Sequence, residues 1–145
     1  VTGSQQDLPE ESQLIADSSL LKGKRVLLVE DNEMNRLVAS ILLDNYEIIT
    51  EEAMNGIEAI HALKQKIYDL VLMDMQMPVM NGLEATEIIR RDINPHIPII
   101  ALTANAIKGE AEKCLQAGMN DYVSKPFEEE HLINTMIKWL QKSEL

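Results

Sequence analysis

Five side chains that can bind cations or phosphate stand at or just past the ends of apolar, strand-like runs. They are Glu30, Asp31, Asp74, Thr103 and Lys125. If the runs are parallel strands of one sheet, their carboxyl ends meet at one edge, and these side chains meet there too. Three carboxylates, a hydroxyl and an ammonium in one crevice are suited to metal-assisted phosphoryl transfer.

Carboxylates this close would repel one another unless a shared proton, the lysine or a divalent cation offset their charge. Hard oxygen ligands with room for water suit octahedral Mg²⁺ or Mn²⁺ better than a closed Ca²⁺ site. A backbone carbonyl near Gln76 could complete the shell. Asp74 would be the nucleophile, Lys125 and the metal would neutralise the transferring group, and Thr103 would hydrogen-bond the acyl phosphate.

Two other interpretations concern the same residues. Asp31 or Asn32 could cap the first helix, and Asn81 the third. Methionines at 73, 75, 77 and 80 surround Asp74, and thioethers bind Cu(I). Because side chains alternate along a strand, Met73 faces away from Asp74, so we interpret the methionines as packing.

The apolar runs predict a parallel sheet. Runs at 25–29, 69–73 and 97–102 lack polar alternation, which is typical of strands buried on both faces. Weaker runs lie at 46–50 and 121–123. We therefore expect five strands.

Helical patterns fill the intervals. Residues 33–44 and 131–140 place apolar side chains at the spacing of one helical face. Asn55 supplies an N-cap for the second helix, and 83–91 and 106–117 fill the remaining positions. The two apolar sets are Met34, Leu37, Val38, Ile41 and Leu42, and Leu132, Ile133, Met136, Ile137 and Leu140.

The strand–helix alternation predicts an α/β fold of the (βα)5, doubly wound, flavodoxin-like type. Its parallel five-stranded sheet should have the order 2-1-3-4-5, with ligands bound between the ends of strands 1 and 3. Residues 1–22 would be a linker, or a short helix capped by Asp7 with Pro9 in its first turn. Residues 23–145 would be the domain.

Composition restricts the possible functions. The 145 residues suffice for one domain with a tail, and no run has the length of a membrane span or signal peptide. A net charge of −11 disfavours binding of nucleic acid and anionic membranes. The single cysteine, Cys114, excludes an internal disulfide and is expected to be buried on a helix, which fits a cytoplasmic protein.

Four segments together resemble a known family. They read VLLVEDNEMNR, DLVLMDMQMPVMNGLEA, IPIIALTANA and AGMNDYVSKPF. Over about 24–142, the chain resembles the receiver domain of two-component response regulators, in the form attached to hybrid sensor histidine kinases. The motifs occur in the family's order, which makes the resemblance specific.

The resemblance implies a role for each residue of the predicted crevice and adds Tyr122. It also implies a cis Lys125–Pro126 bond. The acidic pair is Glu-Asp where many receivers have Asp-Asp, so Glu30 is expected to reach the metal through water. By similarity, Asp74 accepts the phosphoryl group, Glu30 and Asp31 hold Mg²⁺ with the Gln76 carbonyl, Thr103 is the switch hydroxyl, Tyr122 the switch aromatic, and Lys125 contacts the phosphate.

The implied function is phosphorelay. A histidine kinase or histidine phosphotransfer domain would donate from phosphohistidine, and the domain would catalyse its own phosphorylation and dephosphorylation. The parent would be a hybrid histidine kinase, whose membrane anchor, if it has one, would lie outside this domain. A stand-alone single-domain regulator is the alternative. The linker-like start and the absence of an output domain after 142 favour the kinase.

Two other protein classes fit less well. A haloacid dehalogenase phosphatase would require a second acid at 76, where the residue is Gln. An FMN carrier of the same fold would require a loop rich in glycine and hydroxyls after strand 1. That loop reads EDNEMN and would repel a phosphate.

Overall fold

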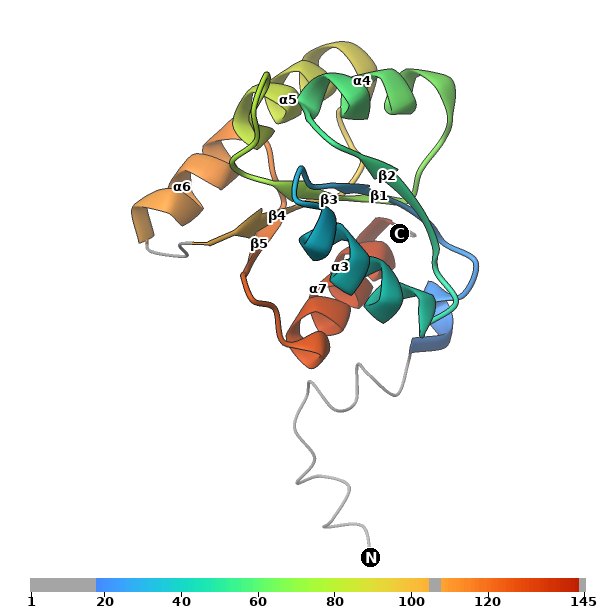
Figure 1. Ribbon diagram of the computed structural model, residues 1–145. Helices are drawn as coiled ribbons and strands as arrows, with labels where there is room; N and C mark the ends of the chain where they lie inside the picture. The colour runs from blue at the N-terminus through green and yellow to red at the C-terminus, as the bar shows by residue number, and fades with distance from the viewer. Residues whose placement is uncertain (1–17, 105–107, 144–145) are drawn as a thin grey trace, which may run out of the picture.

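The computed structural model describes residues 18–104 and 108–143. Its centre is a parallel five-stranded sheet in the order β2-β1-β3-β4-β5, as the sequence predicted (Figure 1). The strands are β1 (Arg25–Val29), β2 (Ile49–Ala53), β3 (Leu70–Asp74), β4 (Ile99–Thr103) and β5 (Asp121–Ser124).

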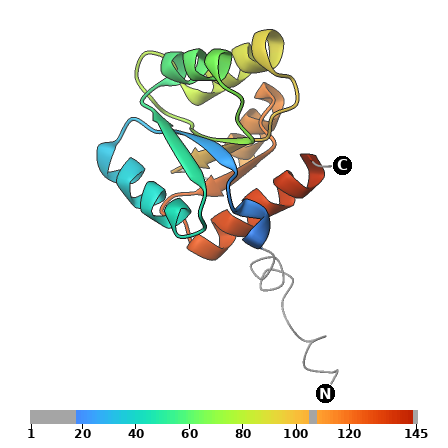
Figure 2. The ribbon, with the colours of Figure 1, turned by 90° about the vertical axis from the view of Figure 1, so that its right-hand side faces the viewer.

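Helices cover both faces of the sheet (Figures 1 and 2). One face carries the 3-10 helix η1 (Ser18–Leu21), α3 (Glu33–Asp44) and α7 (Glu129–Ser143). The other carries α4 (Gly56–Gln65), α5 (Gly82–Ile88) with its π-helical continuation η2 (Ile89–Ile93), and α6 (Lys108–Ala117).

Alternation along the strands produces two hydrophobic cores. Leu28 points into the core beneath α3 and α7, whereas Leu27 points into the core beneath α4, α5 and α6. All five residues of β3 and of β4 are buried. The predicted continuous apolar runs are therefore confirmed as central strands, which hold the end of β3 rigidly in the sheet.

Asparagine caps begin the helices near the edge where the strands end. The side chain of Asn32 accepts from Asn35 N at the start of α3, so this cap is provided by Asn32 and not by Asp31. Asn55 caps α4, as predicted. Asn81 forms a capping box with Glu84 at the start of α5.

The prediction of a strand at 46–50 is wrong by three residues, because β2 covers Ile49–Ala53. The chain leaves α3 through a turn in which Glu47 has a left-handed φ of 61°, and a turn cannot continue a strand. β2 is an edge strand, and its Glu51 and Glu52 broke the apolar pattern. The register pairs Arg25 with Ile49.

The apolar spacing of 33–44 correctly predicted a helix, but most of that set does not face the core. Met34, Leu37, Val38 and Ile41 are 64, 52, 51 and 56% exposed. α3 instead buries Ala39 and Leu43 against the sheet. The same spacing in 131–140 does mark a buried face, since all five predicted residues of α7 are at most 3% exposed.

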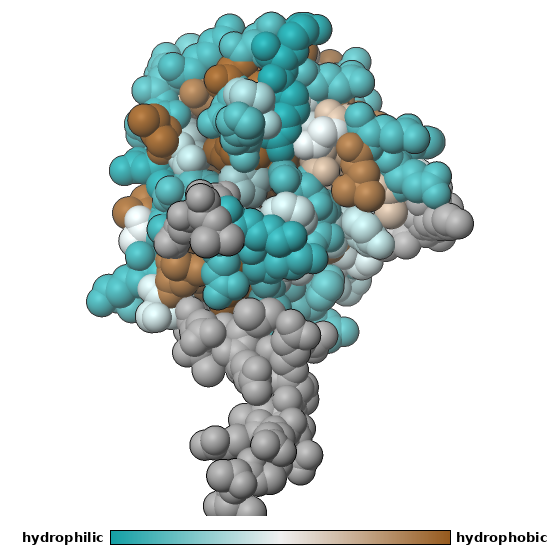
Figure 3. Space-filling model, turned by 180° about the vertical axis from the view of Figure 1, so that it is seen from behind, coloured by the Kyte–Doolittle hydropathy of each residue, from teal (hydrophilic) through white to brown (hydrophobic). Residues whose placement is uncertain are grey.

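The predicted start of a helix at Asp7 and Pro9 lies outside the described residues. None of the described helices is both long and apolar enough to cross a membrane. The view from behind Figure 1, in which α3 is hidden, shows a mainly hydrophilic surface with small separate apolar areas (Figure 3).

Candidate functional site

A cavity of about 430 Å³ opens at the carboxyl edge of the sheet, where β1 and β3 end. This is the topological switch point, at which doubly wound folds bind ligands. The cavity brings together the predicted residues Glu30, Asp31, Asp74, Gln76, Thr103 and Lys125.

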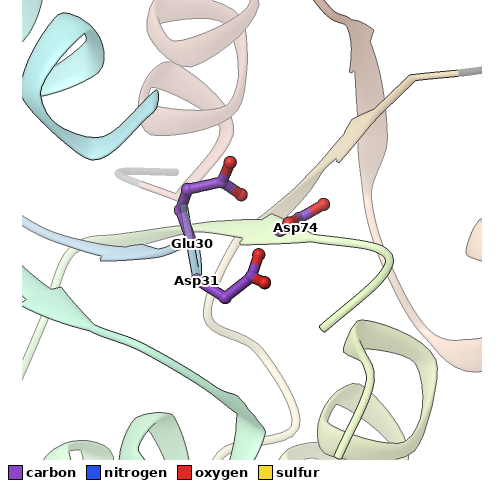
Figure 4. Close-up of side chains that lie close together, drawn as sticks. All are labelled: Glu30, Asp31 and Asp74. Carbon is purple, nitrogen blue, oxygen red and sulfur yellow. The ribbon is translucent and has the colours of Figure 1, made fainter. Parts of the chain in front are cut away.

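Three carboxylates meet in this cavity. Asp74 is the last residue of β3 and only 5% exposed, Glu30 is 1% exposed, and Asp31 is exposed. One oxygen from each lies within 4.8 Å of the others. Figure 4 shows Glu30 and Asp31 extending from the end of β1 beside Asp74. Such a set of hard oxygen ligands fits a small divalent cation.

Lys125 lies between two of the acids. Its Nζ is 3.0 Å from each carboxylate oxygen of Glu30 and 3.1 Å from Oδ1 of Asp74. The side chain of Lys125 is 18% exposed, that of Glu30 is 2% exposed and that of Asp74 is 7% exposed. One ammonium therefore partly offsets two buried carboxylates, as the sequence had suggested.

The pKa values of the two buried acids move apart. Burial, together with the hydrogen bond and charge of Glu30, raises the pKa of Asp74 to about 7, although Lys125 opposes the shift. Burial also acts to raise the pKa of Glu30, but hydrogen bonds with Asp74, Asn35 and Lys125 outweigh it and leave that pKa below its ordinary value. With no cation bound, a proton in this pair resides on Asp74.

Asn35 is a cavity residue that the sequence reasoning missed. Its Nδ2 donates to Oε1 of Glu30 at 2.6 Å, which fixes the glutamate between an amide and the lysine. Its position offered a signal, because the first turn of a helix that follows a strand directly must lie over that strand's end. Glu110 at the start of α6 also lines the cavity.

Of the other predicted residues, Thr103 and Gln76 line the cavity and Tyr122 does not. Thr103 ends β4, is 3% exposed, and accepts from Lys125 N through its carbonyl at 2.7 Å. Gln76 N donates to Oδ1 of Asp74 at 3.3 Å. Tyr122 is half-buried on β5 against the core beneath α4, α5 and α6, and it does not line the cavity.

Several smaller predictions are confirmed. The Lys125–Pro126 bond is cis. Cys114 is buried on α6, with Sγ 3.4 Å from Sδ of Met75. The methionines at 73, 75, 77 and 80 belong to the core or pack against it, which explains them without copper.

The family model of the response regulator receiver domain matches residues 26–137. Among curated proteins, the sensor protein GacS of Pseudomonas syringae is 41% identical over 122 residues, which are 81% of this chain and 14% of that protein. The kinase BarA of Escherichia coli is 41% identical over 128 residues, 86% of this chain and 14% of that protein. The chain therefore spans about one seventh of these relatives.

Solved structures agree. The receiver domain of the sensor histidine kinase PA1611 from Pseudomonas aeruginosa, which has a magnesium ion in its active site cleft, is 42% identical with a TM-score of 0.77, covering 82% of this chain and 98% of that one. The Ssk1 receiver domain of Saccharomyces cerevisiae, solved with the phosphotransfer protein Ypd1, is 32% identical with a TM-score of 0.79, covering 86% and 94%.

Proposed function

Because the chain belongs to the response regulator receiver domain family, we propose that Asp74 accepts a phosphoryl group from a phosphohistidine. The observation that carries this proposal is the position of Asp74, which is 5% exposed at the end of a fully buried strand and 3.1 Å from the Lys125 ammonium. A nucleophile so placed is fixed in orientation, and a cation lies beside it.

The acid cluster would hold Mg²⁺ or Mn²⁺. Its three carboxylates have more negative charge than Lys125 offsets, and their oxygens suit these cations. Asp31 and Asp74 would coordinate the ion with the Gln76 backbone carbonyl, and Glu30 would act through water. When bound, the cation supplies neutralisation of the charge on the transferring group.

The chemical step uses the chain's own residues. A carboxylate oxygen of Asp74 attacks phosphorus, the bond from phosphorus to the imidazole nitrogen breaks, and the imidazole leaves with its electron pair. Asp74 must be ionised, and Lys125 favours that form. Lys125 then donates to a phosphoryl oxygen, and the Thr103 hydroxyl to another. Attack of water on the acyl phosphate would later restore the carboxylate.

The switch would follow from this contact. Movement of Thr103 toward the phosphate would open space into which Tyr122 rotates. Phosphorylation shifts the equilibrium between the two conformations only to the extent that one of them stabilises the phosphoryl group better than the other. The half-buried position of Tyr122, two residues before the end of β5, supports this role.

The phosphodonor would dock on the exposed apolar face of α3. This face consists of Met34, Leu37, Val38 and Ile41. Asn32 and Asn35, at the start of the same helix, line the cavity, so a helical partner lying on this face would bring its histidine close to Asp74. Helix faces of this kind bind apolar faces of partner helices. We propose a histidine phosphotransfer domain or a kinase domain as the partner.

The parent protein would be a cytoplasmic or membrane-anchored hybrid histidine kinase, since the curated relatives GacS and BarA are sensor kinases. A stand-alone regulator is the second candidate. We propose no nucleic acid contact, and no membrane contact for this domain, because of the net charge of −11.

The test is covalent modification. The protein would be incubated with Mg²⁺ and acetyl phosphate, and intact mass measured; a phosphoryl adduct is expected on the wild type and not on Asp74→Asn. No adduct on the wild type, or an equal adduct on the variant, contradicts the proposal. Mass is preferable to tryptophan fluorescence, because Trp139 lies far from the site. Its Nε1 donates a hydrogen bond to Asp121, the first residue of β5, at the opposite end of the sheet.

A further inference from the structure

We propose that Arg36 is a positioning residue that holds the backbone of Glu30 and Asp31 in the bend that points both carboxylates into the site. The inference rests on the proposed function only in taking these acids as metal ligands. Arg36 is the last residue of the segment VLLVEDNEMNR, but no chemical role had been assigned to it from the sequence.

The acidic pair needs such a restraint. In an extended strand, successive side chains point to opposite faces, so Glu30 and Asp31 could not both reach Asp74 if β1 continued. β1 ends at Val29, and Asp31 lies in a bend. Each acid nevertheless offers an oxygen to one cluster with Asp74. A loop between a strand and a helix can adopt many backbone conformations, so specific contacts are needed to favour this one.

The guanidinium of Arg36 binds the backbone of this bend directly. Its Nη1 donates to the carbonyl of Glu30 at 2.9 Å and to that of Asp31 at 3.1 Å. Successive carbonyls of an extended chain point in opposite directions, so one nitrogen can reach both only when the chain bends. The Arg36 side chain is only 12% exposed, which leaves it little freedom.

A second contact fixes the guanidinium itself. Nε of Arg36 lies 3.2 Å from Oε1 of Glu52 on β2, and the other oxygen of Glu52 accepts from Oγ of Ser40 on α3 at 2.9 Å. The arginine thus connects the acidic loop to the neighbouring strand.

The proposal predicts weaker metal binding when the donors are removed. In Arg36→Met, the dissociation constant for Mn²⁺, measured from the electron paramagnetic resonance signal of the free ion, should rise about tenfold, as is common when groups that orient metal ligands are lost. Phosphorylation by acetyl phosphate should need about tenfold more Mn²⁺ for half its maximal rate. At saturating Mn²⁺ the rate should stay within about threefold of wild type.

Arg25→Met is the matched control. Arg25 also pairs with a glutamate of β2, with Nη1 2.7 Å from Oε2 of Glu51, but it lies at the other end of β1. This variant loses one charge and one ion pair, and it should bind Mn²⁺ as the wild type does. Equal Mn²⁺ affinity in Arg36→Met and Arg25→Met would overturn the proposal, even if both lost stability, because Arg36 would then be merely structural.

A conservative variant covers the case in which Arg36→Met does not fold. Arg36→Lys keeps the charge, but one ammonium cannot hold both carbonyls and Glu52 with the same geometry. It should also bind Mn²⁺ more weakly, and wild-type affinity there would overturn the proposal. Failure of the wild type to bind Mn²⁺ is a different result, which would count against the proposed metal site itself.

Discussion

Lys125 donates to both carboxylate oxygens of Glu30, at 3.0 Å each, although the two residues lie 95 positions apart in the chain. The lysine occupies the place of a counter-charge in a cluster that would also bind a cation. A metal ion in this cluster would therefore compete with the ammonium for carboxylates that Lys125 contacts.

Replacing this lysine should separate metal binding from switching. Lys125→Met should bind Mn²⁺ at least as tightly as the wild type, because a competing positive charge is gone. It should fail to respond to beryllofluoride, because the group that would contact the phosphoryl oxygens is missing. Metal binding would be measured from the concentration of free Mn²⁺, and the response to beryllofluoride from changes in the amide NMR spectrum. Loss of Mn²⁺ binding would show that the lysine has been assigned the wrong role.

Asp74 should make the metal-free domain less stable as pH rises. Its pKa is raised from 3.8 to about 7 in the folded state, so the folded protein binds this proton more tightly and unfolding releases it. Stability contributed by this group therefore falls between about pH 4 and pH 7 and stays low above that range.

The variant Asp74→Asn tests that pH dependence. Urea denaturation in EDTA at pH 8 should show the variant to be more stable than wild type by on the order of 1–3 kcal/mol, with the difference shrinking toward pH 4. Added Mg²⁺ should stabilise the wild type by about 2.7 kcal/mol at a hundredfold excess over its dissociation constant. If the wild type and the variant had equal free energies of unfolding at pH 8 in EDTA, ionised Asp74 would not destabilise the folded protein, and the prediction would be wrong.

Gly82 should be essential for the position of Asp74. A Cβ at residue 82 would overlap the Asp74 carbonyl oxygen and lie 3.1 Å from Cγ of Met73. Gly82→Ala should therefore cost about 1–3 kcal/mol of stability, as overpacking does, and slow phosphorylation by acetyl phosphate. Gly109→Ala on α6 is the control, since its Cβ would meet nothing within 4 Å. Equal stability of the two variants would contradict the prediction.

The exposed face of α3 should matter for the protein donor and not for a small one. Val38→Asp places a charge in the middle of that face, where Val38 is 51% exposed, and should slow transfer from a phosphorylated histidine phosphotransfer domain at least tenfold. Phosphorylation by acetyl phosphate should stay unchanged. Ile57→Asp on α4, where Ile57 is also 51% exposed, should affect neither rate. Equal slowing by both variants would argue against docking on α3.

The sequence by itself determined the sheet and the identity of the crevice residues. Continuous apolar runs such as 69–73 indicate strands buried on both faces, and the strand–helix alternation leaves few possible topologies. Once the strand order is known, the side chains at or just past the carboxyl ends of β1, β3, β4 and β5 must meet at one edge, as they do. The register of β2 escaped this reasoning, because an edge strand has one polar side and carries a weaker pattern.

Only the tertiary structure decided which apolar face of a helix is buried. The helices at 33–44 and 131–140 have the same spacing, yet Val38 is 51% exposed and Ile137 is fully buried. α7 contributes five buried apolar side chains to the core, whereas α3 contributes buried Ala39 and Leu43 together with half-buried Leu42. The contacts of Arg36 and Asn35 likewise depend on how α3 lies over the end of β1, because spacing gives the face of a helix but not its neighbour.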